Sequence, residues 1–144
     1  MSLNGTYDDN NIFAKILRGE AAAVKVFENE DVLAFMDLFP QARGHLLVVP
    51  KKVRARNFLD LPAAHVEPLM AHVHKLAIAV EKALKPDGLT VVQFNGAPAG
   101  QTVFHLHFHI IPRYEGVALA GHGHANRADI PELQKIAAEI AAAL

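Results

Sequence analysis

The sequence predicts an α+β fold, with an antiparallel sheet of about five strands and helices on one face of it. Short apolar runs bounded by turn residues indicate strands, and one longer stretch has the apolar spacing of an amphipathic helix. Strands and helices do not alternate along the chain as they would in a parallel sheet. The 144 residues fit one domain.

The first half of the chain predicts one short helix and three strands, at residues 10–18, 24–28, 32–36 and 45–49. Gly19 ends the helix. Asn29-Glu30-Asp31 forms the turn of a β-hairpin between the first two strands, and Pro50 stops the third strand. These elements account for the first part of the sheet.

A long helix follows, with a start signal at Asp60 and Pro62. Its apolar residues form one stripe: Val66, Leu69, Met70, Val73, Leu76, Ala77, Val80 and Leu84. Pro68 is expected to delay the regular helix or to kink its first turn. Ala71 and Ile78 lie off the stripe and hint at a second buried face, and hence at a partner subunit.

The second half predicts two strands at residues 90–95 and 104–111, joined by a loop of small residues at 96–101. Residues 114–127 are rich in glycine and histidine and are expected to form a loop. Asp129 is a plausible N-cap for a last helix. We therefore expect a single domain over residues 1–144, with a flexible segment at 1–9, a loop at 114–128 and a C-terminal helix at 129–144.

Composition excludes several classes of protein. The net charge is −1 with histidine neutral and no Lys/Arg block occurs, so no nucleic-acid partner is expected. The chain has no cysteine, and no apolar run approaches the ~20 residues of a membrane span. Residues 1–11 lack the order of a signal peptide, so we expect a cytoplasmic protein without a membrane partner. The unusual feature is the presence of nine histidines.

Three of these histidines alternate with apolar residues in the segment His105-Leu106-His107-Phe108-His109-Ile110-Ile111-Pro112. Along a strand, alternate side chains share a face. The three imidazoles would then line one face at intervals of roughly 6.6 Å, from a rise of ~3.3 Å per residue. Leu106, Phe108 and Ile110 would face the core.

Three interpretations of this histidine row compete. It could be the polar outer face of a half-buried sheet, or a metal site, since His-x-His on a strand can place two imidazoles on one ion. It could also be a catalytic site acting on an anion. Three collinear imidazoles span too far to share one ion, and no carboxylate follows them. Imidazoles change protonation near neutral pH and can act as nucleophile or acid, which favours catalysis.

A phosphorus atom in front of His107 would have its oxygens covered by an imidazole on each side. Attack by the ring nitrogen would give a covalent nucleotidyl-imidazole, which water then hydrolyses. Backbone N–H groups of the loop from Gly96 to Thr102 are expected to stabilise the phosphoryl oxygens, because Gly96 and Gly100 allow close approach.

The sequence resembles the histidine triad (HIT) family, whose motif His-φ-His-φ-His-φ-φ, with φ apolar, is matched in full by residues 105–111. The resemblance covers nearly the whole chain and leaves only the tail beyond Arg113 unplaced. Its other segments are Ile12 to Ile16 with Gly19-Glu20, Val32 to Asp37, Gly44 to Lys51, and Ala99 to Phe104.

The resemblance implies a role for each matching residue. His107 would be the nucleophile, His109 would contact the α-phosphate and help protonate the leaving group, and His105 and His45 would support the nucleophile. Asp37 would bind the ribose hydroxyls. The remaining substrate-binding residues would be Asn95, Gly100, Gln101 and Thr102 near the phosphate, and Phe13, Phe35 and Leu38 in an apolar purine pocket. The family also implies a homodimer whose sheets join.

Departures from the family pattern refine this picture. Many bacterial members bind zinc through Cys-x-x-Cys and a histidine, but the corresponding positions here hold Asn11, Ala14 and Val53, so no structural zinc is expected. The chain thus resembles bacterial nucleotide hydrolases that lack the zinc-binding cysteines. Phe94 stands where many members have the first of two asparagines. His-Leu-His, rather than His-Pro-His, argues for a hydrolase over a nucleotidyl transferase.

The remaining histidines have simpler interpretations. His65, His72 and His74 are expected on a solvated helix surface, and His122 and His124 in an exposed loop that could bind metal or close over the site.

We therefore expect a hydrolase that releases AMP from a nucleoside phosphoramidate or a dinucleoside polyphosphate, with a small-molecule nucleotide as its partner and with no metal or other cofactor. Two alternatives stay open at this point: a purine-nucleotide-binding interaction protein with little turnover, and a metallohydrolase.

Overall fold

The computed structural model describes residues 3–122 and 126–144 and confirms the α+β fold. One antiparallel sheet has the strand order β1-β2-β3-β5-β4. The strands are β1 (Lys25–Glu28), β2 (Val32–Met36), β3 (Leu46–Pro50), β4 (Gly88–Val92) and β5 (Phe108–Arg113). The helices are α1 (Ile12–Leu17), α2 (Val66–Leu84) and α3 (Ile130–Ala142), with short 3₁₀ turns at Phe58–Asp60, Ala63–His65 and Ala97–Ala99.

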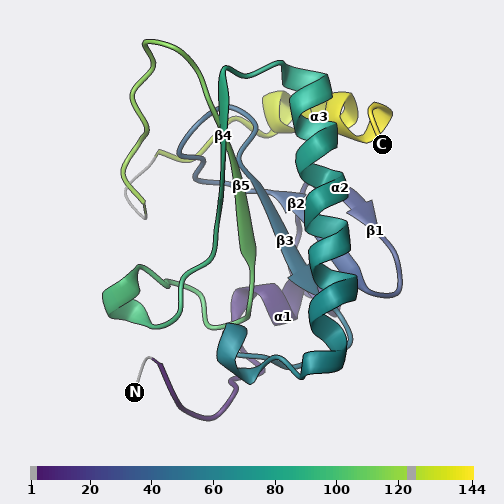
Figure 1. Cartoon of the computed structure of the whole chain (residues 1–144), viewed down its shortest axis with the longest axis vertical. Coiled ribbons are helices and arrows are strands. Elements are labelled where there is room, and N and C mark those ends of the chain that lie inside the picture. Colours follow the sequence, from purple (N-terminus) through teal and green to yellow (C-terminus); the bar gives the residue numbers. More distant parts are fainter. Residues whose placement is uncertain (1–2, 123–125) are drawn as a thin grey trace.

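Helices cover both faces of the sheet, which corrects the expectation that they lie on one (Figure 1). Helices α2 and α3 pack with Val32, Ala34 and Met36 of β2. Helix α1 packs on the opposite face, against Leu33 and Phe35. Every residue of β2 and β3 is therefore buried, because alternate side chains enter different apolar clusters.

Helix α2 begins at Val66 and not near Asp60, in agreement with the delay expected from Pro68. Pro68 is the third residue of the helix, in the first turn, where backbone N–H groups have no partner within the helix. Two 3₁₀ turns occupy the segment that precedes the helix. The helix-start signal at Asp60 and Pro62 therefore coincides with these 3₁₀ turns and not with the start of α2.

The last two strands are displaced from their expected positions. Strand β4 starts at Gly88 and ends at Val92, and β5 starts at Phe108 and not at residue 104. Strand β3 pairs with β5 only from Val48 back to Leu46. Leu106 N–H instead donates to the Ala55 carbonyl at 2.8 Å, so the first two histidines of the triad lie ahead of the strand.

The tail beyond Arg113 returns to the sheet and packs there. Residues 114–122 follow β5 as a loop (Figure 1), in which Ala120 N–H donates to the Gln41 carbonyl and Gln41 Nε2 donates to the Ala120 carbonyl, both at 2.9 Å. Asp129 caps α3 by accepting from Glu132 N–H, as expected. Helix α3 then buries Leu133 and Ile140 against the core.

His72 corrects one sequence-based expectation, because it is packed and not merely solvated. Its Nε2 lies 2.8 Å from Asn29 Nδ2, and its Nδ1 donates to the Pro68 carbonyl at 2.7 Å. Its ring also lies beside Phe27. His72 therefore ties α2 to the β1–β2 hairpin, whereas His74 is exposed.

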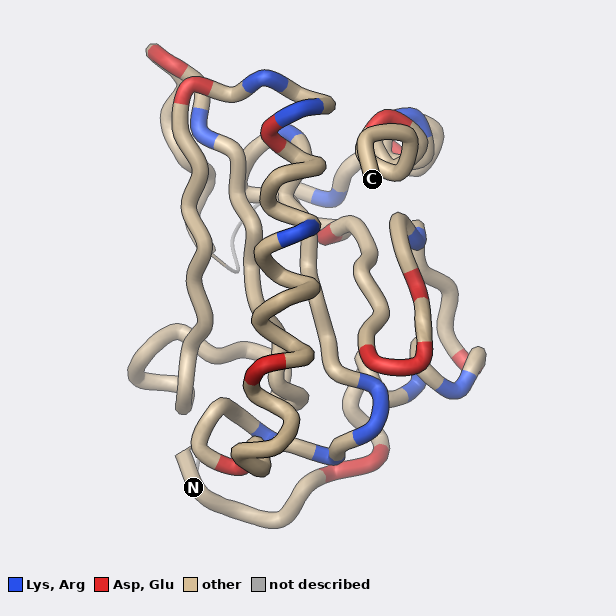
Figure 2. Tube along the Cα trace, turned by 45° about the vertical axis from the view of Figure 1, so that its right-hand side comes forward, with Lys and Arg blue, Asp and Glu red and all other residues tan. Residues whose placement is uncertain are grey.

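Charged residues of both signs are interspersed over turns and helices (Figure 2). No helix in residues 3–122 or 126–144 is long and apolar enough to cross a membrane. Ile78 on α2 and Val91 on β4 are exposed apolar side chains, 41% and 46% accessible. The expected homodimer stays a prediction.

Candidate active site

A cavity of about 460 Å³ opens on the α1 face of the sheet. Seven of the site residues predicted from the sequence line it: Phe13, Phe35, Asp37, Leu38, Thr102, His107 and His109. They come from α1, from the end of β2 and the two residues after it, and from β5 and the segment that leads into it. The fold therefore brings together residues that are up to 96 positions apart in the chain, from Phe13 to His109.

The triad histidines share one side of the chain but are buried. His105, His107 and His109 are 1%, 6% and 2% exposed, which excludes a polar outer face as their role. Leu106, Phe108 and Ile110 enter the core under α2, as the alternation predicted. The ring centroids of His107 and His109 are 4.9 Å apart, less than the spacing of roughly 6.6 Å expected along a strand. The even strand spacing fails because His107 precedes the strand.

The hydrogen bonds of His107 determine which of its nitrogens carries the proton. Its Nδ1 lies 2.6 Å from the carbonyl oxygen of His105, which can only accept, so Nδ1–H is the donor. In the neutral ring, Nε2 then has a free lone pair. Burial lowers the pKa of His107 to about 4, so the ring is neutral at pH 7. His107 thus offers an unprotonated nitrogen beside the cavity.

A chain of hydrogen bonds fixes the opposite tautomer in His109. The backbone N–H of Gln41 donates to His45 Nδ1 at 3.0 Å, so neutral His45 carries its proton on Nε2. That Nε2 lies 2.9 Å from His109 Nδ1, which must accept. His109 therefore carries its proton on Nε2, a buried atom without a hydrogen-bond partner among the described residues.

His45 therefore bonds His109, and its expected role in supporting the nucleophile stays a prediction. Gly44 makes this position possible, because its φ is +91° and a Cβ there would overlap the Leu84 side chain. Asp37 Oδ2 lies 3.5 Å from His45 Nε2. Burial raises the pKa of Asp37, and its Oδ1 accepts from Phe39 N–H.

His105 contacts the site through its carbonyl, which accepts from His107. Its side chain bonds Tyr7, a partner that the sequence did not suggest. Its Nε2 donates to the Pro50 carbonyl at 3.2 Å, and its Nδ1 accepts from the Tyr7 hydroxyl at 2.5 Å. Tyr7 belongs to the segment expected to be flexible. Within the described part of that segment, Asp9 also pairs with Arg54, and the Leu3 carbonyl accepts from Asn57.

Tyr7→Phe is expected to lower the free energy of unfolding by about 1 kcal/mol, because it leaves a buried imidazole nitrogen without its donor. Urea denaturation at pH 7.5 measures this change. Tyr114→Phe is the matched control, since the Tyr114 hydroxyl bonds the Arg43 carbonyl in an exposed place and its loss should have a smaller effect. Equal changes in the two variants would argue against a supporting role for Tyr7.

Three predicted substrate-binding residues do not line the cavity. Gln101 is 3% exposed; its Oε1 accepts from Gly96 N–H and its Nε2 donates to the carbonyls of Arg56 and Val103. Asn95 bonds Phe58 N–H and Gln93. Gly100 N–H donates to the Ala97 carbonyl. These residues shape the loop between β4 and β5, and nothing places them against a phosphate.

Most of the loop N–H groups that were expected to bind the phosphoryl oxygens already donate hydrogen bonds within the protein. The N–H groups of Ala99, Gly100 and Gln101 all donate to carbonyls within the loop, because residues 97–99 form a 3₁₀ turn. Within this loop, Thr102 is the predicted residue that lines the cavity.

His122 comes from a loop expected to be exposed, with closure over the site as one of the two other possibilities for it, and the structure places it at the site. It lines the cavity, its Nε2 donates to the Gly100 carbonyl at 2.6 Å, and its ring lies 5.4 Å from that of His109. The His-Gly-His sequence was the signal for this possibility, but the contact with His109 depends on how the loop packs. His124 lies outside the described residues.

Asp37, His45 and His109 are, within the described chain, a group whose ligand atoms could meet one metal ion, since these atoms lie within 4.8 Å of one another. Two of these ligand atoms, His45 Nε2 and His109 Nδ1, share a hydrogen bond, so a cation would have to displace the proton between them. At a position of the family's zinc site, Asn11 instead caps α1 by accepting from Ala14 N–H. The absence of metal stays a prediction.

Comparison with known proteins agrees with this geometry. The HIT domain family model matches residues 18–116. A HIT-like protein from Bartonella henselae, described as involved in cell-cycle regulation, has a crystal structure that superposes with a TM-score of 0.90 at 50% identity, over 97% of this chain and all of that one. An uncharacterised HIT-like protein of Methanocaldococcus jannaschii is 45% identical over 86% of this chain and 95% of its own. The adenosine 5'-monophosphoramidase of Saccharomyces cerevisiae is 37% identical over 100% of this chain and 89% of its own. The chain therefore belongs to the HIT family.

Proposed function

We propose that this protein is a nucleotide hydrolase that releases AMP through a nucleotidyl-histidine intermediate on His107. The observation that carries the proposal is the pair of opposite tautomers. His107 presents an unprotonated Nε2 and His109 a protonated one, on rings 4.9 Å apart beside the same cavity. A nucleophile and an acid are what cleavage at a phosphorus atom requires.

The reaction proceeds in two balanced steps. The phosphate anion of a bound substrate favours a protonated imidazole, so His109 binds a second proton, from solvent, together with the substrate. His107 Nε2 attacks the α-phosphorus and forms an N–P bond, while the bond to the leaving group breaks and the leaving group takes the Nε2 proton of the His109 imidazolium. Water then attacks the same phosphorus, gives a proton to His109 and displaces His107. AMP leaves, His109 releases its second proton to solvent, and both imidazoles are back in their starting tautomers.

The other lining residues suit the nucleoside. Phe13 and Phe35 have ring centroids 5.3 Å apart in an edge-to-face pair, with Leu38 nearby, and they offer an apolar pocket for the purine. Asp37 is partly exposed at the cavity and can accept hydrogen bonds from the ribose hydroxyls. These two assignments follow the family resemblance and are part of the proposal.

A phosphoramidate is favoured over a dinucleoside polyphosphate. No lysine or arginine is found among the described residues that line the cavity. A polyphosphate leaving group would bring several charges that need cationic partners. The related yeast enzyme, an adenosine 5'-monophosphoramidase by name, supports the same choice.

The first test compares AMP release from adenosine phosphoramidate and from a diadenosine polyphosphate, with EDTA present. We expect release from the phosphoramidate at a higher kcat/KM, unaffected by EDTA. Loss of activity in EDTA would indicate a metallohydrolase. Tight AMP binding without release from either compound would indicate the nucleotide-binding protein.

His109→Ala is expected to lower kcat/KM about 10²- to 10⁴-fold for an alkylamine leaving group and far less for a nitrophenolate. The amine must be protonated to leave, whereas the nitrophenolate leaves as an anion. Steady-state kinetics with the two adenylate substrates measures the difference. An equal loss on both substrates would contradict the role of His109 as the acid.

A further inference from the structure

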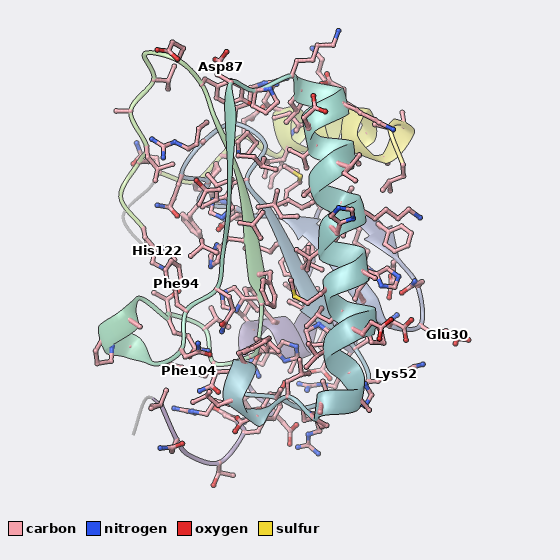
Figure 3. The ribbon with its side chains drawn as sticks, in the orientation of Figure 1. Glu30, Lys52, Asp87, Phe94, Phe104 and His122 are labelled. Atoms are coloured by element: carbon pink, nitrogen blue, oxygen red, sulfur yellow. The ribbon has the colours of Figure 1, made fainter. Side chains whose placement is uncertain are left out.

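Phe94 and His122 lie side by side (Figure 3). Both rings lie next to that of His109, the proposed acid. Phe94 follows β4, and its ring centroid lies 5.3 Å from that of His109 and 4.9 Å from that of His122. His122 comes from the loop after β5 and lies 5.4 Å from His109. We call Phe94 and His122 the aromatic pair.

The aromatic pair is held in place by the chain around it. A Cβ on Gly100 would lie 3.3 Å from Phe94 Cδ1, and Gly100 has φ +109°, so a glycine leaves room for the Phe94 ring. The Gly100 carbonyl accepts from His122 Nε2 at 2.6 Å. Two hydrogen bonds between Ala120 and Gln41 anchor the loop just before His122. The two rings therefore form a built surface.

From these contacts we infer that the aromatic pair is a leaving-group subsite that selects substrates with a flat aromatic ring near the bond that breaks. The inference rests on the proposed function, because the group that takes the proton of His109 must lie on the side of His109. His122 lines the cavity, and Phe94 packs against the rings of both His122 and His109, so the aromatic pair lies at the edge of that space.

The chemistry of this space favours a ring over a charged chain. Phe94 offers an apolar face, and His122 has one nitrogen engaged by Gly100. Flat rings gain from offset or edge-to-face contacts with such side chains, beyond simple burial. A polar asparagine at position 94 would offer no ring face. The substitution of Phe94 for the family asparagine therefore changes which leaving group fits.

The test compares two adenosine phosphoramidates, one made from phenethylamine and one from its ring-saturated analogue, cyclohexylethylamine. Wild-type protein is expected to prefer the aromatic compound in kcat/KM by about 3- to 10-fold. Phe94→Leu, which keeps an apolar side chain, and His122→Gln, which keeps an amide donor for Gly100, should each bring this ratio close to one. Phe94→Tyr keeps the ring and should retain the preference.

Binding of the same two compounds to the His107→Ala variant, measured by calorimetry, separates the subsite from the reaction. If wild-type protein releases no AMP, the proposed function fails, and the ratio of the two affinities still decides the subsite. A ratio near one in wild-type protein, or a ratio that both Phe94→Leu and His122→Gln leave unchanged, would overturn the inference. Equal weak binding of both compounds would do the same.

Discussion

His107→Gln is expected to lower kcat/KM for AMP release from an adenosine phosphoramidate by about 10⁴-fold or more. Glutamine can still donate to the His105 carbonyl, so the local hydrogen bond that orients the side chain is kept. It has no unprotonated ring nitrogen, and the N–P bond cannot form. Steady-state kinetics measures the loss.

The matched control is His74→Gln, the same substitution at an exposed position on α2, which should leave kcat/KM unchanged. A second measurement follows the intermediate itself. Wild-type protein quenched during turnover in alkaline denaturant, which preserves the acid-labile N–P bond, should carry one adenylyl group by mass spectrometry, and His107→Gln should carry none. A variant within tenfold of the wild-type rate would exclude His107 as the nucleophile.

The free energy of unfolding is expected to fall by several kcal/mol between pH 7 and pH 4. Burial is the main cause of lowered pKa values in four site histidines: to about 3 for His45, about 4 for His105 and His107, and about 2 for His109. The unfolded chain takes up protons on these imidazoles near pH 6.5, whereas the folded chain does not. The stabilisation is therefore complete above pH 6.5 and is lost as the pH falls toward the folded-state pKa values.

Asp37 acts in the opposite direction, because burial raises its pKa and protonation of the folded state at higher pH adds stability as the pH falls. With four histidines against one carboxyl group, the net change remains a loss. Urea denaturation at several pH values from 7.5 to 4.5 measures it. His74→Gln should show the same profile, since His74 is exposed. A constant free energy of unfolding over this range would show that the four rings are not buried as neutral groups.

The sequence determined much of the fold and the central part of the site. Apolar alternation placed Leu106, Phe108 and Ile110 in the core and put the triad imidazoles together on the other side, because side chains of an extended chain alternate whether or not it is paired. The motif and its neighbouring segments identified the family. The hairpin of β1 and β2 and the late start of α2 were also foreseen from turn residues and from Pro68.

Tertiary structure alone decided how the histidines are used. The tautomers of His107 and His109 depend on a carbonyl at His105 and on the N–H of Gln41, and backbone partners of this kind leave no trace in residue identity. The role of Gln101 also depends on backbone partners, because its side-chain oxygen and nitrogen bond main-chain groups of Gly96, Arg56 and Val103. Tyr7 contacts His105, which is 98 residues later in the chain. His122 reaches the site because the loop after β5 folds back against Gly100. Local sequence patterns report periodicity within a segment, whereas these contacts depend on how distant segments pack.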